Sequence, residues 1–378
     1  MNVNKEKFLL EEGITYLNHG SFGACPKIVF QDYQNWQARL EKQPVQFFTN
    51  EVYDALKNSR ISLAEFLGCN QDELLFFQNP TTAVSNIIYN LDLEPNDEVL
   101  MTDHEYGALV RAWNAWGKKQ NIHIKYAEIT LPLESKDQFF EDFCKKITSK
   151  TKVIFLSHIT SPTGLVFPIQ DIIDFAKQRK ILTIVDGAHA PGHLDLDIHK
   201  LECDFYTGAL HKWMCGPKGT SFLFVKKEHQ KWMKPVIYSW GKYGDDPENS
   251  EFLQDFQWQG TRDMSAFLTI PKIIEFFKTD LEHFQEHSRK LVLNSRNQFH
   301  HILKTDPISI GDIFLGQMIS FFLPKNEDTN LKSILWQKYK IEIPIFEWKN
   351  RKLIRLSTYA YNDQKDINSL MNALQAII

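Results

Sequence analysis

Short apolar segments alternate with amphipathic segments along the first three-fifths of the chain. Seven of the apolar segments are rich in branched or aromatic residues, as strands are: Leu74–Phe77, Glu98–Thr102, His123–Ile129, Lys152–Ser157, Leu182–Asp186, Phe205–Thr207 and Ser221–Val225. Helical periodicity marks residues 26–43, 51–67, 81–91, 106–120, 136–148 and 168–180. This alternation predicts an α/β fold with a mainly parallel seven-stranded sheet flanked by helices. In such sheets, ligands bind at the carboxyl ends of the strands.

The pattern changes near Ser265. A long helical stretch runs from there to about Lys304, followed by predicted strands at Gln317–Leu323 and Leu353–Ser357 and a final helix near 364–377. We therefore expect a large domain over 1–262 and a smaller α+β domain over 263–378, with about the first 15 residues packing on the small domain. The segment 239–262 contains three glycines and a proline and is expected to be a long functional loop.

Composition narrows the class of protein. A chain of 378 residues exceeds what one core usually organises, which favours two domains. A net charge of -4 argues against a nucleic-acid partner, and no apolar run is long enough to span a membrane. The five cysteines are scattered and without the CxxC spacing of metal sites, so we expect reduced thiols in a cytoplasmic protein.

Two predicted strands end close to residues that can carry chemistry. The strand Leu182–Asp186 ends in a carboxylate, which is costly to bury without a cationic or hydrogen-bonding partner. The strand Phe205–Thr207 leads through a turn to His211 and Lys212, and a lysine that loses its charge can form a Schiff base. Each has a simpler interpretation, since Asp186 could be a helix N-cap and Lys212 a solvated surface residue.

A third strand leads into a helix that begins near Thr81 and Thr82. Free N–H groups and hydroxyls at a helix start suit a phosphate, although a plain threonine N-cap is a common alternative. Taken with Asp186 and Lys212, these residues form the set that an electron-sink cofactor needs: an anion site, an acid for a ring nitrogen and an imine-forming lysine.

The sequence resembles the fold-type I enzymes of the class V aminotransferase family, which depend on pyridoxal 5'-phosphate (PLP), and within it the isopenicillin N epimerase-like branch. The resemblance covers nearly the whole chain, from the motif at 16–23 to those at 354–362. Its most specific stretches are Asp186-Gly187-Ala188-His189 and His211-Lys212-Trp213, the latter followed by Gly216-Pro217-Lys218-Gly219.

The resemblance implies a role for each matching residue. Lys212 would form the Schiff base and move the Cα proton, Asp186 would pair with the pyridine nitrogen, and Tyr106 would stack on the ring. The phosphate would be held by Thr81, Thr82, His211 and Thr207, while His189 and Ser161 would lie near the phenolic oxygen.

The resemblance also implies a substrate site and a partner subunit. Arg355 matches the arginine that binds the α-carboxylate of an amino acid, and a guanidinium suits this role because it can donate two parallel hydrogen bonds. Asn18 and His19 match residues that line the substrate pocket. Thr261 matches a loop that reaches the partner's cofactor phosphate, which implies a homodimer with shared active sites.

The reaction itself stays open. The alternatives are transamination or epimerisation, then a PLP-dependent carbon–sulfur lyase, and then a PLP-binding protein without catalysis. A cysteine desulfurase is disfavoured because no cysteine follows Cys215. No metal site is expected, since Pro191-Gly192 breaks any helix that could align His189 with His193. No membrane partner is expected either, because no apolar run is long enough.

Overall fold

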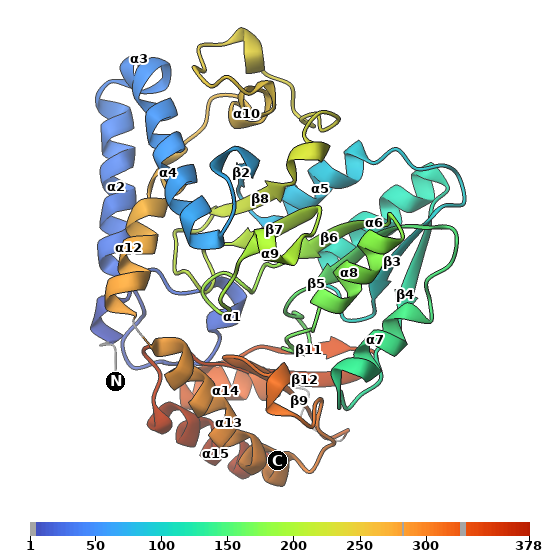
Figure 1. The fold of residues 1–378 in the computed structure, drawn as a ribbon. Coiled ribbons are helices and arrows are strands. Elements are labelled where there is room, and N and C mark those ends of the chain that lie inside the picture. Colours follow the sequence, from blue (N-terminus) through green and yellow to red (C-terminus); the bar gives the residue numbers. More distant parts are fainter. Residues whose placement is uncertain (1–4, 282, 326–329) are drawn as a thin grey trace.

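The computed structural model describes residues 5–281, 283–325 and 330–378. Its central feature is a seven-stranded sheet in the order β2-β8-β7-β6-β5-β3-β4 (Figure 1). The strands are β2 (Leu74–Phe77), β3 (Glu98–Thr102), β4 (His123–Ala127), β5 (Thr151–Ser157), β6 (Leu182–Asp186), β7 (Phe205–Ala209) and β8 (Ser221–Val225). All run in one direction except β8, which lies antiparallel between β2 and β7. The predicted fold class is confirmed.

The side chains of the central strands alternate between two buried clusters. In β5, Ile154 and Leu156 belong to one cluster, whereas Val153 and Phe155 belong to the other. A strand that is buried on both faces has no polar side, which explains the continuous apolar runs in the sequence.

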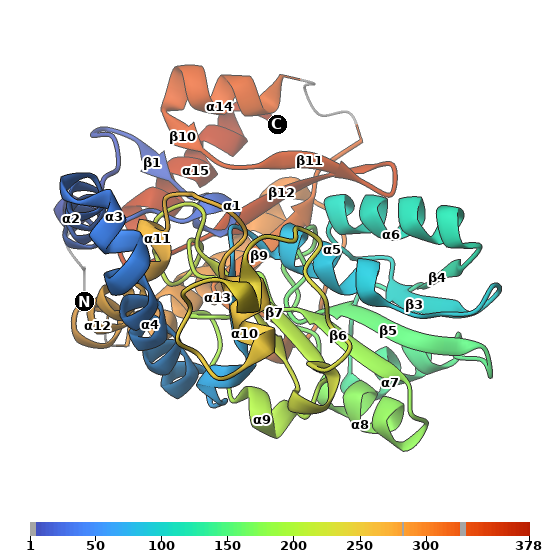
Figure 2. The same cartoon turned by 90° about the horizontal axis from the view of Figure 1, so that it is seen from above.

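Helices cover both faces of this sheet. They are α2 (Lys27–Lys42), α4 (Val52–Leu67), α5 (Pro80–Asn90), α6 (Gly107–Gln120), α7 (Lys136–Cys144), α8 (Gln170–Gln178) and α9 (Ile198–Leu201), with the short α1 (His19–Phe22) and α3 (Pro44–Gln46) near the N-terminus. Figure 2 shows α5 and α6 on one side of the sheet and α8 and α9 on the other. Helix α4 ends as its sequence predicts, because Gly68 adopts the left-handed conformation that closes a helix (φ 66°).

The helical stretch after Ser265 is three helices rather than one, which corrects the prediction. These are α11 (Ser265–Leu268), α12 (Ile270–Asp280) and α13 (Phe284–Leu303). The last two serve different layers: α12 packs against α2 and α4 beside the large sheet, whereas α13 packs against β9 and the C-terminal helix α15 (Figure 1). The chain turns at His283, which has a positive φ of 60°.

The C-terminal part contains a second, antiparallel sheet in the order β11-β12-β9. Its elements are β9 (Met318–Phe322), α14 (Leu331–Tyr339), β10 (Ile341–Glu342), β11 (Ile345–Trp348), β12 (Arg351–Ser357) and α15 (Gln364–Ile377). Strands β9 and β12 match the predicted ones, whereas the sequence pattern does not predict β10 and β11. Strand β10 pairs with β1 (Thr15–Tyr16), and the ring of Phe8 contacts Tyr359 and Tyr361, so the N-terminal segment lies on this part of the chain.

The segment 239–262 is not entirely loop, because it contains α10 (Glu251–Gln257). The hydroxyl of Ser250 accepts a hydrogen bond from the backbone N–H of Leu253, and Phe252, Leu253 and Phe256 are buried against the large sheet. A serine N-cap followed by apolar residues is the sequence signal for this helix, and the surrounding glycines obscure it.

Two further findings concern the whole described chain. Within the described ranges, no helix combines the length and apolar character needed to cross a bilayer. All five cysteines are free, and Cys203 and Cys215 are buried.

Candidate active site

A cavity of about 550 Å³ opens at the carboxyl ends of β5 and β6. Nine of the thirteen residues expected at the site line it: Thr81, Thr82, Tyr106, Ser161, Asp186, His189, His211, Lys212 and Arg355. They come from segments far apart in sequence, because parallel strands bring their carboxyl ends to one edge of the sheet.

Asp186 and Lys212 reach the cavity from neighbouring strands. Asp186 ends β6, is 3% exposed and accepts a hydrogen bond from the Ala188 N–H (2.9 Å). Burial raises the pKa of this carboxyl above its ordinary value, although the Ala188 N–H and Lys212 oppose the shift. Lys212 follows β7 through a turn closed by the hydrogen bond from Gly216 N–H to the Leu210 carbonyl (2.9 Å).

The amine of Lys212 is disposed toward its neutral form. Removal from water lowers its pKa to about 8, with the attraction of Asp186 opposing and the charge of Arg355 assisting that shift. Its Nζ lies 3.1 Å from Nε2 of His189. A lysine that is partly neutral near physiological pH is a competent nucleophile and proton acceptor.

Helix α5 directs its first turn at the cavity. Its N-cap is Asn79, not a threonine: Asn79 Oδ1 accepts from the N–H of Thr82 (2.9 Å) and from its hydroxyl (3.1 Å). Pro80 occupies the first turn, which leaves the threonine side chains at an N-terminus that favours anions. His211 also lines the cavity, and its Nδ1 lies 3.1 Å from the Thr220 carbonyl oxygen.

Arg355 brings a buried cation from β12. One terminal nitrogen donates to the Ser161 carbonyl (2.5 Å) and hydroxyl (3.3 Å), and the other donates to the Ser21 hydroxyl (3.0 Å). Among the described residues, none accepts a hydrogen bond from its buried Nε. Burial lowers the pKa of the guanidinium to about 10. The group is therefore held in place by neutral partners and, within the described ranges, has no carboxylate of its own.

Tyr106 differs from these residues because it is 46% exposed. It is the residue before α6 and has extended backbone (φ -63°, ψ 127°), which directs the chain into the helix at the mouth of the cavity. An exposed aromatic ring at this position is free to cover a planar ligand.

Four of the expected residues do not line the cavity. Asn18 and His19 lie behind it: Asn18 contacts Glu342, while His19 is fully buried between Tyr361 and the Lys212 carbonyl. Thr207 donates to the Phe222 carbonyl (2.7 Å) inside the sheet, and Thr261 lies in an exposed segment. The cavity is lined instead by the next three residues of the first motif, Gly20, Ser21 and Phe22.

The sequence interpretation also missed a buried acid below the cavity floor. Glu105 accepts hydrogen bonds from the hydroxyls of Ser157 and Thr102, both at 2.5 Å, and Ser157 lines the cavity. Burial raises the pKa of Glu105 to about 7, and the charge of Asp186 adds to the shift. Its position directly before Tyr106 was the only available signal.

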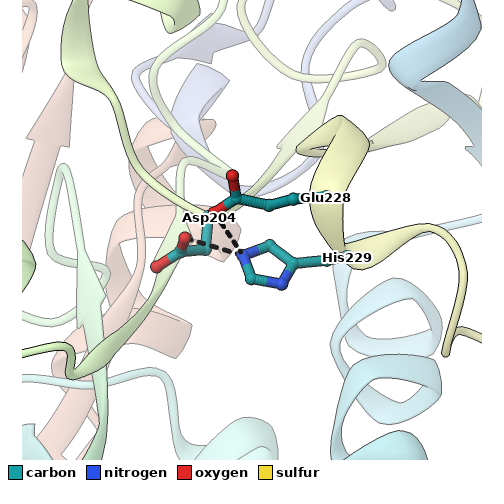
Figure 3. Close-up of side chains that lie close together, drawn as sticks. All are labelled: Asp204, Glu228 and His229. Carbon is teal, nitrogen blue, oxygen red and sulfur yellow. Dashed lines mark hydrogen bonds and ion pairs between the residues drawn. The ribbon is translucent and has the colours of Figure 1, made fainter.

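A second polar cluster lies at the opposite edge of the sheet, where β7 begins and β8 ends. Figure 3 shows its three side chains. Within the described part of the chain, Asp204, Glu228 and His229 form the one group whose ligand atoms are close enough for a metal ion. His229 Nε2 lies 2.8 Å from Asp204 and 3.6 Å from Glu228, and Asp204 also accepts from the Thr183 N–H and hydroxyl. These contacts account for the cluster as a hydrogen-bonded group centred on Asp204.

Known proteins resemble this chain in sequence and in fold. A profile of the family described as aminotransferase class-V matches residues 25–370. Isopenicillin N epimerase of Amycolatopsis lactamdurans is 32% identical over 390 residues, covering 99% of this chain and 97% of that protein. A probable chloroplastic L-cysteine desulfhydrase of Arabidopsis thaliana is 24% identical, covering 96% and 82%. A structure of C-DES with glycine covalently linked to its PLP cofactor has a TM-score of 0.84 at 20% identity, covering 99% of this chain and all of that one.

Proposed function

Because this chain belongs to the class V aminotransferase family of PLP-dependent enzymes, we propose that Lys212 and Asp186 hold the cofactor and that the reaction starts at the Cα–H bond of an amino acid. The observation that carries the proposal is the meeting of a partly neutral amine and a desolvated carboxyl at one cavity. The preferred outcome is epimerisation or transamination.

The residues present fit PLP. Among the described residues, Asp186 accepts a hydrogen bond from a backbone N–H and from no cationic side chain. Its carboxylate can therefore pair with a protonated ring nitrogen. The N-terminus of α5 with Thr81 and Thr82 suits a phosphate. The buried Nε of Arg355, which no described residue accepts from, suits a carboxylate brought in by the substrate.

Each side chain at the cavity has a separate role toward the cofactor or the substrate. When bound, PLP supplies an electron-withdrawing ring that stabilises negative charge at Cα. Lys212 Nζ would hold the cofactor covalently and would accept the proton from Cα of the substrate. Asp186 would keep the ring nitrogen protonated, Tyr106 would shield the cofactor from water at the mouth of the cavity, and Arg355 would orient the substrate's α-carboxylate.

The relatives favour different outcomes after the proton is removed. The likeness to an isopenicillin N epimerase over nearly the full length of both chains supports epimerisation. A carbon–sulfur lyase is the second candidate, supported by the likeness to a cysteine desulfhydrase. Sulfur transfer to an enzyme cysteine has no support here, because Cys215 is the last cysteine and is buried.

One experiment separates these outcomes. Purified holoenzyme is incubated in deuterated water with a panel of L- and D-amino acids, with and without a 2-keto acid. Deuterium at Cα with inverted configuration and no need for the keto acid supports epimerisation, whereas amino transfer to the keto acid supports transamination. Pyruvate with a released thiol from cysteine supports the lyase. If no amino acid of the panel exchanges its Cα hydrogen for deuterium, the proposal is wrong.

We further propose that two copies share their active sites. The segment before α10 exposes Ile237, Tyr238, Trp240 and Tyr243, each at more than half of its surface, and apolar residues gathered in this way favour a protein partner. Thr261 follows α10 and is exposed, as a residue that serves the partner's cofactor must be in the isolated chain. Sedimentation equilibrium at micromolar concentration tests this, and a monomeric holoenzyme with full activity contradicts it.

A further inference from the structure

Three side chains form a hydrogen-bonded series at the base of the cavity. The indole N–H of Trp213 donates to His189 Nδ1 (3.2 Å), and His189 Nε2 lies 3.1 Å from Lys212 Nζ. The His189 ring is 2% exposed, and Trp213 is fully buried, so water does not compete for these contacts.

The position of the indole is fixed from several sides. Its ring packs against His193 at 4.2 Å and His19 at 5.1 Å between centroids, and its backbone carbonyl accepts from the Tyr359 hydroxyl (2.8 Å). A Cβ added at Gly20 would lie 3.3 Å from the indole ring, so the chain approaches it closely. The Trp213 N–H therefore points at one atom of one ring.

This contact decides which nitrogen of His189 carries the proton. An indole N–H can only donate, so Nδ1 of His189 must accept and cannot carry a hydrogen. The proton of the neutral imidazole is then on Nε2, which faces Lys212. Burial also lowers the pKa of His189 well below its ordinary value, so that the ring stays neutral.

The opposite arrangement is inconsistent with the geometry. If a charged Lys212 donated to Nε2, the imidazole proton would move to Nδ1 and face the Trp213 N–H at 3.2 Å, donor against donor. The buried indole N–H would also lose its acceptor, which is costly. Lys212 is therefore the acceptor, and it accepts with the lone pair of a neutral amine.

We infer that Trp213 is a positioning residue that holds His189 as the Nε2–H tautomer, so that a fixed hydrogen-bond donor faces the amine of Lys212. The inference rests on the proposed function in taking that amine as the group that bonds the cofactor. It goes further in assigning His189 a donor's role only: with Nδ1 occupied, His189 is not the second base that epimerisation requires.

The surroundings of the His189 ring are consistent with this assignment. The charged and titratable groups that act on it are Lys212, Arg355, His193 and His211, and all of them lower its pKa. Among the described residues, the acid that acts on Lys212 is Asp186, which favours the charged amine. Trp213 and His189 thus oppose Asp186 in setting how much of the amine is neutral.

The first test is made on the cofactor-free protein and uses one variant, His189→Gln, to assign the signal. Nitrogen-15 NMR of the imidazole rings distinguishes a protonated Nε2 from a protonated Nδ1, and His189→Gln identifies the signal by its loss. We expect the His189 signal of the cofactor-free protein to be that of the Nε2–H tautomer above about pH 8, where the amine of Lys212 is neutral. A protonated Nδ1 in the wild-type protein overturns the inference.

The second test measures the pH dependence of covalent attachment of PLP to the cofactor-free protein, which requires neutral Lys212. In Trp213→Phe, His189 is free to turn its lone pair toward the ammonium, so we expect the midpoint of the attachment rate to rise by about one pH unit. In a His189→Ala background, the same substitution should leave the midpoint unchanged. Equal midpoints of wild type and Trp213→Phe overturn the inference.

Trp113→Phe is the matched control. Trp113 is likewise fully buried, and no described residue accepts a hydrogen bond from its Nε1, so its replacement removes an indole without removing a contact to the site. We expect no change of the midpoint in this variant. If PLP does not attach to wild type at all, the proposed function fails, while the NMR experiment still decides the tautomer.

Discussion

The two edges of the central sheet surround an aspartate differently and shift its pKa in opposite directions. At the carboxyl edge, Asp186 is buried with one backbone donor, and its pKa is raised by burial. At the amino edge, Asp204 is also removed from water, yet hydrogen bonds from His229 and Thr183 lower its pKa despite that burial. Asp186 is the last residue of β6, and Asp204 directly precedes the neighbouring strand β7.

The difference shows at which edge of the sheet charged side chains are left without a partner from the chain, so that a ligand can pair with them. At the amino edge, donors from the chain satisfy the carboxylate, and nothing further is needed. At the carboxyl edge, Asp186, Lys212 and Arg355 are each held in position without an oppositely charged partner within hydrogen-bonding distance among the described residues. Perturbed groups without internal partners, gathered at one cavity, are typical of an active site.

Replacement of Lys212 gives the largest expected effect. In Lys212→Ala, PLP should bind without a covalent link, and turnover should fall by at least about 1,000-fold, because the variant lacks both the anchoring amine and the proton acceptor. Borohydride trapping followed by mass spectrometry measures the link, and amino-acid turnover measures the rate.

Lys226→Ala is the control at the other edge. Lys226 pairs with Glu228 at 3.4 Å on the surface, and such pairs contribute little. We expect covalent attachment and turnover in this variant to match wild type. Turnover in Lys212→Ala within about tenfold of wild type would contradict the role given to the amine.

Paired asparagine variants test the comparison directly. Asp186→Asn should lower turnover by about 100-fold, since the amide cannot hold a proton on the ring nitrogen, yet leave the cofactor-free protein as stable as wild type or more so. Asp204→Asn should keep turnover but lower the free energy of unfolding by about 1–3 kcal/mol, because it weakens the hydrogen bonds from His229 and Thr183. Urea unfolding of the cofactor-free proteins and turnover of the holoenzymes provide both readings. The same loss of stability in both variants would remove the distinction.

Arg355 extends the comparison to a cation. Arg355→Lys keeps the charge but loses the planar pair of donors, so we expect KM for the amino acid to rise about tenfold with a smaller change in kcat. Arg351→Lys on the same strand is the control, because Arg351 is exposed and its guanidinium stacks on Phe322 rather than facing the cavity. Equal KM values for wild type and Arg355→Lys would show that the substrate's carboxylate is bound elsewhere.

The carboxyl edge was largely predictable from the sequence, and the reason is geometric. Asp186 ends an apolar strand and Lys212 follows the next one, so the rule for parallel sheets places both at one edge from the order of strands alone. Most of the seven strands were predictable because burial on both faces leaves largely apolar runs, whereas β4 at the sheet edge is only partly buried.

The parts that escaped prediction depend on contacts between distant segments. Ser21 reaches the cavity only because the N-terminal segment pairs with β10 and packs against Tyr361, and no local pattern records that. The same packing places His19 behind the cavity wall. Strand β11 is partly exposed and, among the described strands, pairs with β12 alone, so its sequence carries little of the apolar signature on which strand prediction relies.

The smallest expected effect is the most specific to the comparison, because the two aspartates should respond to pH with opposite signs. The folded-state pKa of Asp204 is lowered, so its contribution to stability is present above the pKa of the unfolded chain and is lost as the pH falls through the folded-state value. The folded-state pKa of Asp186 is raised, so the folded protein gains relative stability as the pH falls toward the ordinary value near 3.8, and loses it as the pH rises through the folded-state value.

In the cofactor-free protein, Asp186→Asn should therefore exceed wild type in stability at about pH 8, and this advantage should vanish toward about pH 4. Asp204→Asn should be less stable than wild type at about pH 8, with a deficit that shrinks only below about pH 4, where the wild-type carboxylate begins to take up its proton. Urea unfolding at half-unit steps of pH gives both difference curves, which should lie on opposite sides of zero and converge at acid pH. Curves on the same side would mean that the carboxyl edge satisfies Asp186 as fully as the amino edge satisfies Asp204, leaving the cofactor no unmet charge to complete.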